Sequence, residues 1–164
     1  MRDLTGIEAA ELREAMEAEA VTHLGRMLLE FSRLDMHLGL CACWVDDGAQ
    51  LDTLTPRIAK MAFEARRVFL SKAVAKKFAP SSEAGKAYAT WLAGAAEARL
   101  LRNRLVHGRW GVEPHTGHVV NVVGLPTSPD QHSQPFTLKE LAAHVDHLQQ
   151  LQFELARLRK LWPL

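Results

Sequence analysis

The sequence predicts a mainly all-α protein, an antiparallel bundle of four to five helices with a small β-hairpin after the third long helix. Three observations lead to this fold class. Apolar residues recur at every third or fourth position over long stretches, which is the spacing of amphipathic helices. Thr5 with Glu8, and Thr137 with Glu140, form capping boxes that mark helix starts. Between residues 108 and 124 the helical spacing of apolar residues stops, and β-branched residues flank a turn sequence.

The composition is that of a single globular domain over residues 1–164. Hydrophobic residues make up 48% of the chain and the net charge is +1, which suits one buried core and excludes a chain that is strongly basic throughout. Cys41 and Cys43 lie two positions apart in an apolar run, so we expect both to be buried, reduced thiols. No signal peptide and no apolar run of bilayer length is apparent, and we therefore expect a cytoplasmic protein without membrane contact.

The first helical pattern begins with an acidic segment, residues 1–20, which we interpret as an N-terminal helix or arm. Its apolar stripe continues to Leu38, and the pattern leaves open whether residues 7–45 form one helix or two. A turn sequence, Asp46-Asp47-Gly48, ends this segment. The face opposite the stripe is polar and consists of His23, Arg26, Glu30, Arg33 and His37.

The second long helix is predicted to begin at Thr55 and Pro56 and to run to Lys77. This segment holds seven basic residues and one acidic residue, which indicates either a local positive field or a solvated helix face. The basic residues are Arg57, Lys60, Arg66, Arg67, Lys72, Lys76 and Lys77. A serine, Ser81 or Ser82, is expected to cap the third long helix.

The third long helix is predicted to end in a run of polar residues. We expect His107 at its C-terminus and Gly108 in the left-handed cap conformation. Asn103 lies four residues before His107 on the same face, and the long Arg102 side chain reaches toward that face. Histidine exchanges protons near neutral pH, and arginine binds phosphate oxygens with a planar fork of donors. The combination favours phosphate chemistry, and the alternative is that these cations only cap the helix end.

The rest of the chain is predicted to form a hairpin insert at residues 108–124, a loop and a last helix. Strands at residues 110–113 and 118–123 flank a Pro-His-Thr-Gly turn. Residues 125–136 contain three prolines and are predicted to be a mobile surface loop. The last helix follows the Thr137 capping box and ends before the final Trp-Pro pair.

The run RNRLVHGRW, residues 102–110, resembles the signature of the HEPN superfamily in the form common among bacterial members. In that signature an arginine, a polar residue, a short spacer and a histidine lie near a helix end. The resemblance implies a metal-independent endoribonuclease that acts on RNA as a homodimer and needs no cofactor. It further implies a toxin or defence component, for which an antitoxin protein would be the partner.

The resemblance assigns catalytic roles to Arg102, Asn103 and His107. His107 would move the proton that lets a ribose 2′-OH attack the adjacent phosphorus, and Arg102 would stabilise charge on the phosphoryl oxygens. Asn103 would position the histidine or the phosphate. The products would be a 2′,3′-cyclic phosphate and a 5′-OH, and the basic second helix would attract the RNA backbone.

Substrate-binding roles are predicted for Arg99, Arg104, Arg109 and Asp35. Asp35 falls on the apolar stripe of the first helix, where a buried carboxylate needs a partner, and Arg99 or Arg102 are the expected partners. The alternative is an aspartate at the edge of the stripe that reaches water. Its Phe-Ser-x-Leu-acid context also resembles the family, in which the usual acid is glutamate.

No metal site is expected. His115, His118 and His132 lie in a turn and a loop without a carboxylate cluster beside them. His144 and His147 are three apart on the last helix, where a solvated face explains them better than a metal does.

A second class of function is a non-catalytic nucleotide- or partner-binding helical module, for example one paired with a nucleotidyltransferase. The cleft at Arg102, Asn103 and His107 would then hold a phosphate-bearing ligand, and the acidic first helix would bind a basic partner. A third interpretation is a structural helical dimer module with an inert cleft.

Overall fold

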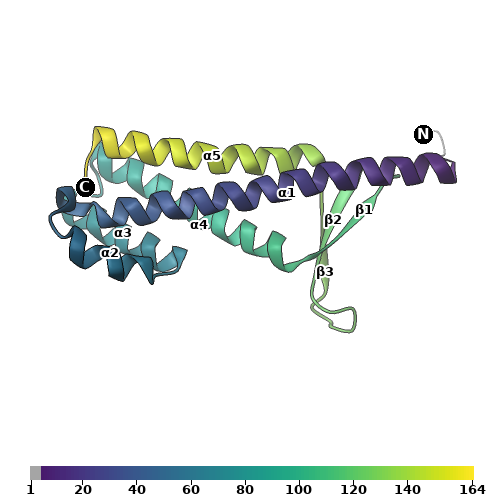
Figure 1. Ribbon diagram of the computed structural model, residues 1–164, viewed down its shortest axis with the longest axis horizontal. Helices are drawn as coiled ribbons and strands as arrows, with labels where there is room; N and C mark the ends of the chain where they lie inside the picture. The colour runs from purple at the N-terminus through teal and green to yellow at the C-terminus, as the bar shows by residue number, and fades with distance from the viewer. Residues whose placement is uncertain (1–4) are drawn as a thin grey trace. The chain divides into compact units, whose positions relative to one another are not determined.

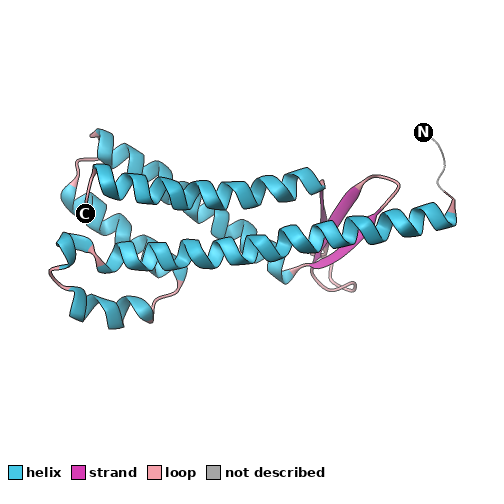
Figure 2. Ribbon diagram, turned by 45° about the horizontal axis from the view of Figure 1, so that its top comes forward, coloured by secondary structure: helices cyan, strands magenta, loops and turns pink. Residues whose placement is uncertain are grey.

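The computed structural model describes residues 5–164, and this part of the chain is mainly helical (Figure 1). It contains five α-helices and a three-stranded antiparallel sheet, which lies between α4 and α5 in the chain (Figure 2). The predicted fold class is confirmed. The elements are α1 (Gly6–Cys43), the short 3-10 helix η1 (Val45–Gly48), α2 (Leu51–Ala59), α3 (Phe63–Lys77), α4 (Glu83–His107), β1 (Arg109–Glu113), β2 (His118–Val123), β3 (His132–Phe136) and α5 (Leu138–Leu161).

The chain divides into two compact units. The first, here called the sheet unit, comprises the N-terminal residues up to Leu29 together with Leu101–Asp146. The second, here called the helical unit, comprises Glu30–Leu100 and His147–Leu164. Helices α1, α4 and α5 each contribute one segment to each unit. Among the described residues, no helix is both long and apolar enough to cross a membrane.

Helix α1 is a single helix, which answers the question that its sequence pattern left open. The capping box is formed as predicted, because the Thr5 backbone N–H donates to Glu8 Oε2 at 2.9 Å and the Glu8 N–H donates to Thr5 Oγ1 at 3.3 Å. Cys41 and Cys43, near the other end, are buried and free of any disulfide, as expected. Burial raises the pKa of the Cys41 thiol to about 11, so this thiol is not a reactive one.

The core of the helical unit is apolar, and two of its aromatic rings place their polar ends on backbone carbonyls. The Trp91 indole N–H donates to the Leu151 carbonyl at 2.7 Å, and the Tyr88 hydroxyl donates to the Trp162 carbonyl at 2.9 Å. These hydrogen bonds let large rings be buried without leaving a donor unpaired, and they connect α4 to α5 and the residues after it. Aliphatic side chains of the same unit that are at most 1% exposed are Leu34, Leu38, Ile58, Leu70, Leu155 and Leu158.

Two helices stand where one was predicted to start at Thr55. Helix α2 begins four residues before Thr55 and ends at Ala59, and the proline after Thr55 lies inside it. Arg66 of α3 donates from Nε to the Ile58 carbonyl at 3.2 Å and from Nη2 to the Ala59 carbonyl at 3.4 Å. The end of α2 is therefore capped by a side chain from the next helix. The prediction of one helix was wrong because the apolar spacing continues across the break.

Glu30 is buried, although its position in the helical pattern predicted an exposed polar face. Its carboxylate accepts hydrogen bonds from Gln152 Nε2 at 2.8 Å, from Gln149 Nε2 at 3.2 Å and from Arg33 Nη1 at 2.7 Å. Burial raises the pKa of Glu30, but the two amide donors and the Arg33 charge together outweigh burial, so the pKa lies below its usual value. This network connects α1 to α5 within the helical unit.

The sheet has the strand order β1-β2-β3, and both pairs are antiparallel. The predicted hairpin is confirmed, with Gly117 at φ +70° in its turn. The predicted loop at residues 125–136 is wrong for its last five residues, which form β3. Pro135 lies in that strand, opposite Val120. Proline has no backbone N–H, but it is tolerated in an edge strand such as β3. The prolines and polar residues of this segment predicted a loop because the sequence does not show that the segment pairs with β2.

Candidate functional site

The signature residues lie on the last two turns of α4, in the sheet unit. The helix starts where Ser82 Oγ accepts the Gly85 backbone N–H at 3.1 Å, which confirms a serine cap. At the other end the helical hydrogen-bond pattern persists to Gly108, whose N–H donates to the Arg104 carbonyl at 3.2 Å. Leu105 anchors this end because its side chain is buried, while His107 in the same turn is exposed.

Gly108 is needed for space rather than for a left-handed backbone. Its φ is not positive, so the expectation of a left-handed cap is wrong. A Cβ atom at this position would overlap the side-chain carboxamide of Asn121 on β2. Asn121 is only 1% exposed, and neither polar atom of its carboxamide has a hydrogen-bond partner among the described residues. The residue after His107 is therefore fixed by direct packing of the sheet against the helix end.

Trp110 joins the hairpin to the same turn of α4. Its indole N–H donates to the Leu105 carbonyl at 3.0 Å, which satisfies one of the free carbonyls at the helix C-terminus. Its ring lies 5.8 Å from the ring of Phe136 on β3, and that ring meets His144 edge-on at 6.2 Å. Packing before and after His107 thus holds the backbone of this residue between the helix and the sheet.

Arg102 and Asn103 are brought together directly. Arg102 Nη1 donates to Asn103 Oδ1 at 3.0 Å, so the amide oxygen holds one edge of the guanidinium. This leaves the Asn103 NH₂ group as a donor for a ligand or a neighbouring group. The exposed His107 ring forms no hydrogen bond or ion pair with any described residue, so its two nitrogens are open to a ligand.

Arg104 and Arg109, which were predicted to bind substrate, hold the loop and strand that follow the helix. Arg104 Nη1 donates to Gln134 Oε1 on β3 at 2.9 Å. Arg109 Nη2 donates to the Gly124 carbonyl at 3.1 Å. Both side chains are exposed and keep further donors available for an anion.

The other two predicted substrate-binding residues, Asp35 and Arg99, lie in the helical unit and have partners there. Asp35 Oδ1 accepts from Arg66 Nη1 at 2.8 Å, and Arg66 also donates to the Asp35 carbonyl at 3.3 Å. Arg99 is one of the two partners expected for Asp35, but it forms an ion pair with Glu64 instead, with Arg99 Nε 3.3 Å from Glu64 Oε2. Hydrogen bonding from Arg67, together with the charges of Arg67 and Arg99, keeps the pKa of Glu64 below its usual value.

Asn121 is the residue of this region that the sequence did not single out. One signal was present, because Asn121 is the only polar residue in a run of four valines and alternates with Val119, which is also buried. Its contact with Gly108 depends on how the hairpin folds back on the helix, which no local pattern shows. Among the described residues, no three potential metal ligands come together.

Comparison with known proteins adds no relative: no family model, no curated protein and no solved structure matches this chain. A functional conclusion therefore depends on the residues and contacts described above.

Proposed function

We propose that this chain is a metal-independent endoribonuclease of the HEPN type that cleaves RNA through Arg102, Asn103 and His107. The observation that carries the proposal is the Arg102–Asn103 hydrogen bond, placed just over one helical turn before an exposed histidine. A fixed guanidinium can stabilise charge on phosphoryl oxygens and an accessible imidazole can transfer the proton of a ribose 2′-OH, so the two groups together suit the cleavage of an RNA phosphodiester.

The reaction needs no group beyond the RNA and these side chains. A base removes the proton of the ribose 2′-OH, the 2′-oxygen attacks the adjacent phosphorus, and the bond from phosphorus to the 5′-oxygen breaks. The 5′-oxygen leaves with a proton, and the products are a 2′,3′-cyclic phosphate and a 5′-OH. His107 moves the proton, and Arg102 stabilises negative charge on the non-bridging oxygens as it develops.

Pre-organisation of the helix end supports this assignment. Electrostatic stabilisation of a transition state is effective when the donors do not have to reorganise during the reaction. The Trp110–Leu105 hydrogen bond and the packing of Asn121 on Gly108 restrict the backbone on both sides of His107. Asn103 limits the orientations of the Arg102 guanidinium.

The active form in this proposal is a homodimer in which the signature helices of two protomers meet across the two-fold axis. An exposed Val106, four residues after Arg102 on the same helix face, provides apolar surface for such a contact. As a toxin or defence component, the enzyme would be restrained by an antitoxin protein.

The experiment is cleavage of end-labelled RNA in EDTA by the wild type, Arg102→Ala and His107→Ala. We expect the wild type to produce cyclic phosphate ends and each variant to be slower by about a hundredfold or more. His147→Ala, the same change at an exposed histidine of α5, is the matched control and should cleave like the wild type. A substrate with a 2′-deoxy residue at the cleaved position should resist.

Two outcomes would contradict the proposal. Equal cleavage by all four proteins would mean that another site or a contaminant acts on the RNA. No cleavage by folded wild type would favour the non-catalytic alternative, in which the same residues hold a phosphate-bearing ligand or a partner. A saturable rise in melting temperature with a phosphate-bearing ligand, lost in Arg102→Ala, would then support that alternative.

A further inference from the structure

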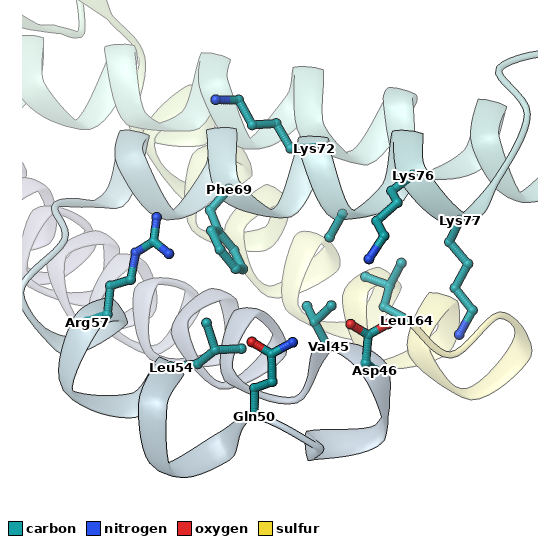
Figure 3. A pocket seen from close by; sticks show the side chains of 11 residues that line it. Val45, Asp46, Gln50, Leu54, Arg57, Phe69, Lys72, Lys76, Lys77 and Leu164 are labelled. Carbon is teal, nitrogen blue, oxygen red and sulfur yellow. The ribbon is translucent and has the colours of Figure 1, made fainter.

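A pocket of about 490 Å³ lies in the helical unit, and most of its lining residues belong to η1, α2 and α3 (Figure 3). Its volume is within the range of small-molecule sites in proteins. None of the signature residues lines it. The polar and charged lining residues are Asp46, Gln50, Arg57, Lys72, Lys76 and Lys77.

The lining of the pocket carries an excess of positive charge, with four basic side chains and one carboxylate, that of Asp46. Arg57, Lys72, Lys76 and Lys77 line it, and none of them forms an ion pair with any residue that the structure describes. Other arginines of the same unit, Arg66 among them, are paired with carboxylates. The four cations of the pocket are therefore available for an anion from outside.

Repulsion among these cations also favours an anionic ligand. Lys72 and Lys76 are four residues apart on α3, a spacing at which like charges destabilise a helix. Figure 3 shows Lys76 and Arg57 on either side of Phe69, with Lys77 at the end of the pocket near Asp46. An anion between these groups would relieve the repulsion, and several donors would bind more than one of its oxygens.

The rest of the lining is apolar and includes an aromatic ring. The Arg57 guanidinium carbon lies 5.6 Å from the centre of the Phe69 ring, and the buried Leu54 forms the wall beside it. Stacked flat groups and an aliphatic wall favour a ligand that carries a ring as well as charge. Phosphate alone would leave this surface unused.

Asp46 and Gln50 place hydrogen-bonding groups at the same pocket. Asp46 has a positive φ of 55°, a conformation that costs free energy in a non-glycine residue and that is followed by two more residues of positive φ. The turn presents the Asp46 side chain beside Gln50 (Figure 3). A carboxylate and an amide can together recognise the donors and acceptors on the edge of a heterocyclic ring.

We propose that this pocket binds an organic polyphosphate that carries a heterocyclic ring, the chemistry of a nucleoside triphosphate. Arg57, Lys76 and Lys77 hold the phosphates, and the ring packs against the wall formed by Phe69 and Leu54. Binding here requires neither Arg102 nor His107, so it is independent of RNA cleavage.

The test is isothermal titration calorimetry with ATP, inorganic tripolyphosphate and adenosine as separate probes. We expect ATP to bind, tripolyphosphate to bind more weakly and adenosine not to bind at the same concentrations. The double variant Arg57→Gln/Lys76→Gln should weaken ATP binding about tenfold or more, because it removes two of the four cations. ATP affinity should also fall as salt is raised.

Lys60→Gln/Lys86→Gln is the matched control, because it removes the same amount of charge from two exposed residues outside the pocket. It should bind ATP within about twofold of the wild type, since neither side chain lines the pocket and exposed charges are weakened by salt. Equal weakening in both double variants would show only general attraction to a positive protein and would overturn the proposal. So would the absence of ATP binding by the folded wild type. Tripolyphosphate binding as tightly as ATP would overturn the role given to the apolar wall.

Discussion

At Gly108 the absence of a side chain makes room for a neighbour. Asn121 fills the space where a Cβ atom would stand, and its carboxamide is buried against the helix end. A glycine in a helix-end motif is usually explained by its access to positive φ. Here the cause is close approach between a strand and a helix end, so the requirement depends on a residue thirteen positions away.

We predict that Gly108→Ala lowers the free energy of unfolding by about 1–3 kcal/mol, the usual cost of overpacking a filled site. In an Asn121→Ala background the same change should cost less than about 0.5 kcal/mol, because the obstructing side chain is gone. Urea denaturation of the four proteins measures the coupling. Gly111→Ala on β1 is the control, because a Cβ there meets no atom within 4 Å. An equal cost of Gly108→Ala in both backgrounds would contradict the packing explanation.

Among the elements of the helical unit, α1, α2 and α3 meet at one guanidinium. Arg66 of α3 binds the Asp35 side chain and carbonyl on α1 and the last two carbonyls of α2. A helix as short as α2 has little stability of its own and depends on such contacts. Gly39 on α1 lies close by, since a Cβ there would stand 3.4 Å from Arg66 Nη1.

We predict that Arg66→Ala lowers the free energy of unfolding by about 2–4 kcal/mol, since it leaves the Asp35 carboxylate and the Ala59 carbonyl without their Arg66 donor and removes one of two donors to the Ile58 carbonyl. Arg66→Lys should recover part of this loss, because lysine keeps the charge but lacks the planar fork. The control is Arg67→Ala, which removes an ion pair within one helix and should cost under about 1 kcal/mol. Thermal and urea unfolding give the values, and an Arg66→Ala cost no larger than that of Arg67→Ala would refute the linking role.

At the scale of the whole molecule, stability depends on carboxylates that are held in the charged form. The pKa of Glu30 is lowered on balance, and those of Glu8, Glu64 and Glu140 are lowered too. A carboxyl group whose pKa is lower in the folded state than in the unfolded state stabilises the fold above the unfolded pKa. That stabilisation is lost as the pH falls through the folded pKa.

We therefore predict that stability falls as the solution is acidified from about pH 5, and that Glu30→Gln reduces this fall. At neutral pH the substitution should cost about 2 kcal/mol, because Arg33 and two glutamine amides lose their charged acceptor. The difference from the wild type should shrink toward low pH. Glu97→Gln, at an exposed residue of α4, should leave the pH profile parallel to that of the wild type. The measurement is the urea midpoint of each protein between pH 3 and 7. A Glu30→Gln profile parallel to that of the wild type would contradict the role given to the Glu30 carboxylate.

The sequence by itself determined the helical segments of α1, α4 and α5, their N-terminal caps and the hairpin, because these depend on residues close together in the chain. The Thr5 and Thr137 boxes, the Ser82 cap and the strands around the turn at Gly117 all form as their local patterns predict. It also placed Arg102, Asn103 and His107 at the end of α4, since a helix end and a four-residue spacing are local properties. Their role in catalysis stays a prediction.

Only the tertiary structure decided which groups are partners. It buried Glu30 against Gln149 and Gln152, paired Asp35 with Arg66, and packed Asn121 on Gly108. It also paired β3 with β2 and gathered four unpaired cations of α2 and α3 around one pocket. These contacts join residues far apart in the chain, and a periodic pattern records which face of a helix is apolar but not which side chain it will meet.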